Sequence, residues 1–80
     1  MRVNVKLYAT LQKLAPPGTE VGEAFPVDME GSTILQLVEQ LGIEEDMARI
    51  VMVNGIRATD LSQPLQPEDL VVIFPPIGGG

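Results

Sequence analysis

Alternation of apolar and polar residues is the clearest pattern in the first part of the chain. From Arg2 to Tyr8 every second residue is apolar, and this period of two predicts a strand with one buried face and one wet face. Glu23–Met29 alternates again, and Pro26, which has no amide hydrogen to donate, predicts that this strand lies at a sheet edge. Leu70–Phe74 is apolar throughout, as expected for a strand at the centre of a sheet.

Two segments have helical spacing. Ile34–Leu41 carries apolar residues at i, i+3, i+4 and i+7, which predicts a helix with one apolar face. Thr33 and Gln36 have the spacing of a capping box at its start. A weaker pattern over Ala9–Ala15, behind a candidate cap at Thr10, predicts a second, short helix.

The dipeptide Asn54-Gly55 lies between the apolar runs Ile50–Val53 and Ile56–Ala58. It favours a two-residue type I′ turn, because both residues tolerate positive φ. One main helix then has to cover one face of a mixed sheet of about five strands. We therefore predict an α+β fold, a β-grasp (ubiquitin-like) roll, over residues 1–74, followed by a flexible tail over residues 75–80.

Composition narrows the chemistry. The 80 residues include no cysteine and no histidine, which excludes a disulfide, a zinc thiolate, a thiol nucleophile and the commonest general base near neutral pH. A net charge of −6 has the wrong sign for binding nucleic acid or an anionic membrane, and it favours a basic protein partner. No apolar run is long enough for a membrane span and the first residues do not resemble a signal peptide, so we expect a cytoplasmic protein.

The last residues carry the most distinctive pattern. Pro75-Pro76 follows the last predicted strand, and two prolines favour an extended backbone that aims the tail away from the domain. Glycine has no Cβ, so the run that ends the sequence can thread a narrow channel, although glycine runs at chain ends are also often frayed. We expect the carboxylate of Gly80 to reach into the active sites of partner proteins at the end of an extended segment, the predicted thread, which consists of Pro75, Pro76, Ile77, Gly78 and Gly79.

Strand parity predicts a docking surface beside this tail. Tyr8 shares the outer face of the first strand with Lys6, and Phe74 faces outward if the last strand alternates. Aromatic residues on an otherwise polar sheet face are candidate interface anchors. The alternative is that Phe74 packs inward or under Pro76 and that Tyr8 is an isolated surface ring. Met29 and Met52 are expected in the core.

The order of elements, the Asn54-Gly55 hairpin, the exit Phe74-Pro75-Pro76 and the terminal Gly79-Gly80 together resemble the MoaD/ThiS family of ubiquitin-like sulfur carriers, closest to the molybdopterin synthase small subunit (MoaD-like). The resemblance runs over essentially the whole chain. It implies that an E1-like adenylating enzyme (MoeB/ThiF-like) adenylates Gly80 and that a sulfur donor converts it to a thiocarboxylate. The molybdopterin synthase large subunit (MoaE-like) would then use this sulfur in molybdopterin (molybdenum cofactor) biosynthesis. In that role the chain is a co-substrate and not an enzyme, and it needs no cofactor or metal.

The same resemblance implies roles for individual side chains. It maps Tyr8 and Phe74 onto hydrophobic contacts with the E1-like partner, and it places Arg57 near a third such position that is usually apolar. Pro75-Pro76 and the short helix after the first strand favour the molybdopterin branch over the thiamine branch. Gly78 departs from the family, in which a small side chain is commoner there. Two alternatives stay open: a sulfur carrier for thiamine thiazole synthesis, and a ubiquitin-like modifier or interaction module.

Overall fold

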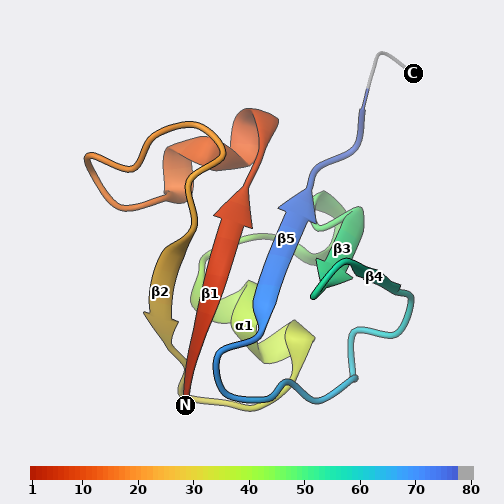
Figure 1. The fold of residues 1–80 in the computed structure, drawn as a ribbon. Coiled ribbons are helices and arrows are strands. Elements are labelled where there is room, and N and C mark those ends of the chain that lie inside the picture. Colours follow the sequence, from red (N-terminus) through yellow and green to blue (C-terminus); the bar gives the residue numbers. More distant parts are fainter. Residues whose placement is uncertain (78–80) are drawn as a thin grey trace.

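Five strands form one mixed sheet in the computed structural model, which describes residues 1–77 (Figure 1). Their order across the sheet is β2-β1-β5-β3-β4. β1 and β5 run parallel and the other neighbours are antiparallel, so the last strand lies beside the first, as predicted. The elements in chain order are β1 (Arg2–Leu7), the 3-10 helix η1 (Ala9–Leu14), β2 (Phe25–Asp28), α1 (Ile34–Gln40), the 3-10 helix η2 (Glu45–Met47), β3 (Ile50–Val53), β4 (Ile56–Ala58) and β5 (Leu70–Phe74).

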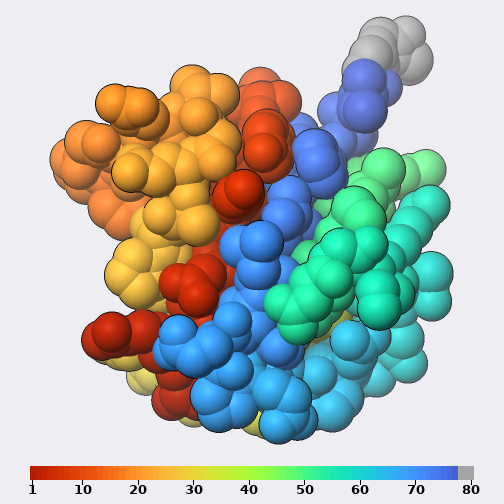
Figure 2. Space-filling view, viewed as in Figure 1, coloured from red at the N-terminus to blue at the C-terminus, as the bar shows by residue number. Residues whose placement is uncertain are grey.

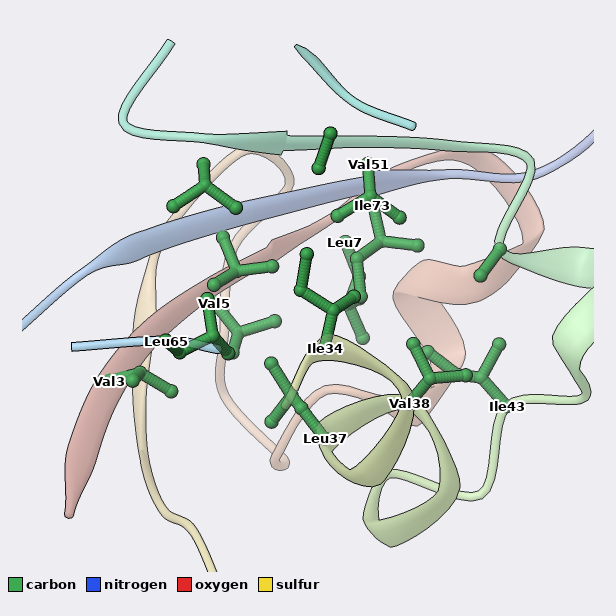
Figure 3. Packing of buried hydrophobic residues seen from close by; sticks show 14 of the residues in the cluster. Val3, Val5, Leu7, Ile34, Leu37, Val38, Ile43, Val51, Leu65 and Ile73 are labelled. Carbon is green, nitrogen blue, oxygen red and sulfur yellow. The ribbon is translucent and has the colours of Figure 1, made fainter. Parts of the chain in front are cut away.

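A single apolar core fills the space between α1 and the sheet (Figure 3). Alternation along β1 buries Val3, Val5 and Leu7, which are 0, 0 and 1% exposed. Leu37 and Val38 of α1 are fully buried on the opposite side of this core. Burial of one such side chain contributes about 1.5–3 kcal/mol. Because the core fixes which side chains of each strand face α1, it also fixes which side chains face away from it. The strand order with one helix packed on one face of the sheet confirms the predicted β-grasp fold.

The predicted capping box begins α1. The amide of Gln36 donates to Thr33 Oγ1 at 3.2 Å, and the amide of Thr33 donates to Gln36 Oε1 at 3.1 Å. These two bonds satisfy backbone donors that a helix start leaves without partners.

The predicted hairpin is also present. Asn54 and Gly55 have φ values of 52° and 83°, as a type I′ turn requires. The side chain of Asn54 has a second use: its Oδ1 accepts from the amide of Leu70 at 2.9 Å, and its Nδ2 donates to Asp69 Oδ1 at 2.8 Å. The turn between β3 and β4 is thereby tied to the first residue of β5.

Two predicted elements differ in detail. The segment after β1 is a 3-10 helix whose cap position is Tyr8, with no side-chain capping bond, so Thr10 is not its cap. The chain enters η1 through Ala9 at a φ of 53°, and the amide of Leu11 donates to the carbonyl of Tyr8. The predicted strand Glu23–Met29 is shortened to β2, which lies at the sheet edge as predicted. No helix within residues 1–77 has the length and apolar character to cross a membrane.

Candidate functional site

The chain leaves the globule at the carboxyl end of β5. Pro75 is buried, whereas Pro76 is exposed and Ile77 is 82% exposed. Figure 2 shows the segment after β5 standing off from the surrounding surface. Gly78, Gly79 and Gly80, which the sequence predicts to deliver the carboxylate, lie outside the described residues. Of the predicted thread, Pro75 therefore packs with the domain, and exposure begins at Pro76.

Backbone hydrogen bonds hold this exit from both sides. The amide of Tyr8 donates to the carbonyl of Ile73 at 3.3 Å, and the amide of Arg49 donates to the carbonyl of Phe74 at 2.9 Å. The first bond comes from the end of β1 and the second from the residue before β3. The last residues of β5 are therefore fixed between two neighbouring strands, and this sets the direction in which the tail starts.

Tyr8 and Phe74 meet beside the exit. Their ring centroids are 4.9 Å apart and their planes are inclined by 12°, so the two rings are stacked. Such a pair contributes about 0.5–1.5 kcal/mol beyond the area that it buries. On the side of Phe74 away from Tyr8, Phe74 pairs with Ile50 of β3. The loop residue Gly22 lies against Tyr8: a Cβ at position 22 would be 3.7 Å from Tyr8 Oη. Phe74 therefore alternates with the buried residues Val71 and Ile73 and faces outward, and Tyr8 is not an isolated ring.

Arg57 lies in a second row on the same outer face. The strand register aligns Lys6 with Val72, Val72 with Met52, and Met52 with Arg57. Arg57 is exposed, and the side chains of the other three residues in this row are partly buried. This row is displaced by two residues along each strand from the row that contains Tyr8 and Phe74. The structure thus places all three predicted contact residues on one face of the sheet.

The expectation that Met52 lies in the core is wrong. Met52 alternates with the buried residues Val51 and Val53 and faces outward, whereas Met29 is buried as expected. Ile50–Val53 is apolar at every position, so its sequence does not reveal which residues face α1. For the same reason the sequence did not reveal Ile50 and Val72 as members of the outer face. Val72 pairs with Lys6 of the alternating strand β1, and Ile50 pairs with Phe74 two residues further along β5. The alternation of β1, carried across β5 by this register, is the signal that would have identified both.

Polar chemistry is sparse in the described residues. They include no buried polar or charged side chain, and no group of three or more Asp or Glu residues that could hold a metal ion. The pKa of the Asp60 carboxyl is lowered by hydrogen bonds from the Ser62 hydroxyl at 2.6 Å and the Ser62 amide at 2.9 Å. Asp60 lies in the segment that leads into β5, and the tail leaves the other end of that strand. Within residues 1–77 the features beside the tail are therefore the exposed exit at Pro76 and Ile77 and the outer face that includes the stacked pair Tyr8 and Phe74.

A model of the ThiS family matches residues 5–80. The chain belongs to the ThiS family. The match includes all of the predicted tail, so the family prediction made from the hairpin, the strand exit and the terminal glycines is confirmed. No curated protein matches the chain.

Solved structures share the fold of this ThiS-family chain. A crystal structure of SAMP1 from Haloferax volcanii superimposes with a TM-score of 0.66 at 23% identity, over 100% of both chains. A protein-protein complex of subunits 1 and 2 of the molybdopterin-converting factor from Helicobacter pylori 26695 includes a chain similar at a TM-score of 0.61 and 21% identity, over 100% of both chains. A crystal structure of small archaeal modifier protein 1 from H. volcanii gives 0.66 and 22%, over 95% of this chain and 98% of that chain. At these identities the likeness establishes the β-grasp fold of the ThiS-family chain and nothing finer.

Proposed function

We propose that this chain is a sulfur carrier whose Gly80 carboxylate is adenylated by an E1-like enzyme and converted to a thiocarboxylate. The single observation that supports this most is the exit of the chain: β5 is held on both sides up to Phe74, and Pro76 and Ile77 are exposed beyond it. The Tyr8–Phe74 stack beside that exit provides an apolar surface for a docking enzyme. The family match through residue 80 supports the role of the terminal glycines.

The proposed chemistry needs little from the carrier. A carboxylate oxygen of Gly80 attacks the α-phosphorus of ATP and pyrophosphate leaves, which gives an acyl adenylate. A sulfur nucleophile from a donor then attacks the acyl carbon, and AMP leaves with the bonding electron pair. The enzyme supplies the nucleotide site and the donor supplies the sulfur, so the carrier contributes a carboxylate and a docking surface. The absence of histidine and cysteine is compatible with this passive part.

Molybdopterin biosynthesis is the pathway that we propose for this sulfur. The support is the Pro75-Pro76 exit, the 3-10 helix directly after β1, and the similarity to a chain of the molybdopterin-converting factor complex. In this pathway the large synthase subunit (MoaE-like) is the second partner. A carrier for thiazole synthesis would use the same tail but would pass its sulfur to a different acceptor enzyme.

A second candidate function is protein modification. The fold is similar to that of SAMP1 and of small archaeal modifier protein 1 from H. volcanii, and the second of these is named as a modifier. In that case Gly80 would form an isopeptide bond with a lysine amine after adenylation, and AMP would again be the leaving group.

Mass spectrometry of the intact protein distinguishes these functions. The carrier, incubated with an E1-like enzyme from the same organism, ATP and sulfide, is expected to gain the mass difference between sulfur and oxygen. Removal of Gly80, or Gly79→Val, is expected to abolish this gain without altering the melting temperature, because a β-branched side chain blocks a narrow channel. Covalent attachment to lysines of other proteins would support the modifier instead. An unchanged mass and no ATP turnover with the E1-like enzyme would overturn the proposal.

The pathway is tested with the thiocarboxylated protein. Sulfur transfer in the presence of the molybdopterin synthase large subunit, and none with a thiazole synthase, is the expected result. The reverse preference would assign the carrier to the thiamine branch.

A further inference from the structure

The sheet has an uneven distribution of charge. The protein has 11 acidic and 5 basic residues. None of the acidic residues lies on β1, β3, β4 or β5, whereas these strands hold Arg2, Lys6 and Arg57. The acidic residues lie instead on α1, on η2, on the edge strand β2 and in the connecting segments. The outer face beside the tail thus differs in charge from the rest of the surface.

Two of these cations stand at the ends of one apolar row. Lys6 on β1 and Arg57 on β4 are separated by Val72 and Met52, in register across four strands. Three strand spacings put the Cα atoms of Lys6 and Arg57 about 14 Å apart. The neighbouring row toward the tail is apolar, since it consists of Tyr8, Phe74 and Ile50.

Neither Lys6 nor Arg57 has an ion-pair partner within residues 1–77. Within residues 1–77 a salt bridge joins Arg2 to Asp28 at 3.4 Å. Arg2, the third cation of this face, is thereby paired with a carboxylate of the neighbouring strand β2. Lys6 is partly buried beside Val72, so its stem packs on the sheet while its ammonium group reaches the surface. Arg57 is exposed beside Met52. The face therefore presents two unneutralised positive charges with apolar side chains between them.

We propose that this face selects an adenylating enzyme whose contact surface is apolar at its centre and carries carboxylates on both sides, one facing Lys6 and one facing Arg57. The inference rests on the proposed function, because the E1-like enzyme is the partner concerned. It reverses, for the contact surface, the expectation of a basic partner that the net charge gives. Charges more than about 8 Å from a contact are largely screened at physiological salt, so the local cations decide the match and the distant carboxylates do not.

Charge reversal with a matched control tests this selection. Lys6→Glu, Arg57→Glu and Lys13→Glu each change the net charge by the same amount, but Lys13 is an exposed residue of η1 and not of the sheet. The readout is the KM for the carrier in thiocarboxylate formation by the E1-like enzyme. We expect Lys6→Glu and Arg57→Glu each to raise KM about tenfold and the double variant about a hundredfold, while Lys13→Glu stays within about twofold.

Salt and stability measurements complete the test. The KM of the wild type is expected to rise with sodium chloride concentration, and that of the double variant is expected to stay flat or fall. All variants are expected to keep the far-ultraviolet circular dichroism and melting temperature of the wild type, since both side chains reach the surface. Arg57→Met keeps an apolar stem and removes the charge, so it separates packing from charge: it should raise KM less than Arg57→Glu.

Each outcome is decisive. Equal KM values for Arg57→Glu and Lys13→Glu, or a KM of the wild type that falls with salt, would overturn the charge selection while leaving sulfur transfer intact. A wild-type protein that gains no sulfur at all would instead overturn the proposed function. A variant that loses its fold is replaced by Lys6→Gln or Arg57→Gln, for which a smaller rise in KM is expected.

Discussion

Three residues other than glycine have positive φ within residues 1–77: Ala9, Asn54 and Glu68, at 53°, 52° and 70°. Asn54 fits, because asparagine tolerates this conformation and its side chain bonds to Leu70 and Asp69. Ala9 has no polar side chain to compensate. Its backbone turns the chain from β1 into η1 directly after Tyr8, which keeps that ring beside Phe74. Strain at Ala9 thus accompanies the geometry of the proposed docking face.

This strain makes Ala9→Gly a stabilising substitution. The left-handed region costs an L-residue about 1–2 kcal/mol, and the added chain entropy of glycine offsets about 0.5–1 kcal/mol of that gain. We expect the free energy of unfolding to rise by up to about 1 kcal/mol, measured by urea denaturation at an unchanged slope. Thr10→Gly is the control: it lies in the same 3-10 helix at an ordinary φ and should destabilise. Equal losses for both variants would show that Ala9 is unstrained.

Single side chains were predictable from the sequence only where the alternation was visible. Tyr8 follows a strand whose apolar and polar residues alternate strictly, so its outward direction followed from parity. Met52 lies in a run that is apolar at every position, and its direction depends on which strand it pairs with. That pairing is a long-range property, and no local pattern contains it.

Among the elements, α1 depends most on local sequence. It has seven residues, too few to be stable alone, so its start relies on capping and its face on the core. The capping box was readable because its two residues are three positions apart. η1 was predicted as a helix of unspecified type, and the structure shows a 3-10 helix, a form that is common in short connecting segments. The bounds of β2 depend on how many of its residues pair with β1. The sequence of one strand alone does not reveal the extent of that pairing.

Thr33→Ala tests the contribution of the capping box. Loss of the Oγ1 acceptor leaves the amide of Gln36 without its partner, and we expect the free energy of unfolding to fall by about 1 kcal/mol, within a range of about 0.5–2 kcal/mol. Thr33→Ser keeps the acceptor and should recover most of this loss. Ser32→Ala is the matched control, because Ser32 is exposed and only its backbone amide bonds to Gln36. Denaturation of the four proteins in guanidinium chloride gives the comparison, and equal losses for Thr33→Ala and Ser32→Ala would contradict the role of the cap.

At the scale of the whole molecule, the topology was more predictable than the surface. The order of strands and helix leaves few arrangements once crossovers are required to be short and right-handed, and β5 beside β1 is one of them. The net charge suggested a basic partner, but a net charge says nothing about where on the surface the charged residues lie. Only the register shows that Lys6 and Arg57 share a row that includes no carboxylate.

The fold also separates the residues that hold the domain together from the residues that we propose to dock. Leu37 is fully buried between α1 and the sheet, whereas Phe74 is partly buried on the opposite face. Leu37→Ala should cost about 2–5 kcal/mol through the cavity that it leaves, which is a large part of the stability of a small domain. Phe74→Ala loses the stack on Tyr8 and part of the burial of one ring, and we expect a smaller cost, about 1–2 kcal/mol.

Their effects on docking should have the opposite order. At a temperature where both variants are folded, Phe74→Ala should raise the KM of the adenylation reaction about tenfold or more, because an aromatic anchor beside the tail is lost. Leu37→Ala should leave that KM within about twofold of the wild type, because the outer face is unchanged. Unfolding curves and KM values measured on the same samples give both rankings. If Leu37→Ala raised KM as much as Phe74→Ala, the two faces of the sheet would be coupled, and the outer face would not act as an independent docking surface.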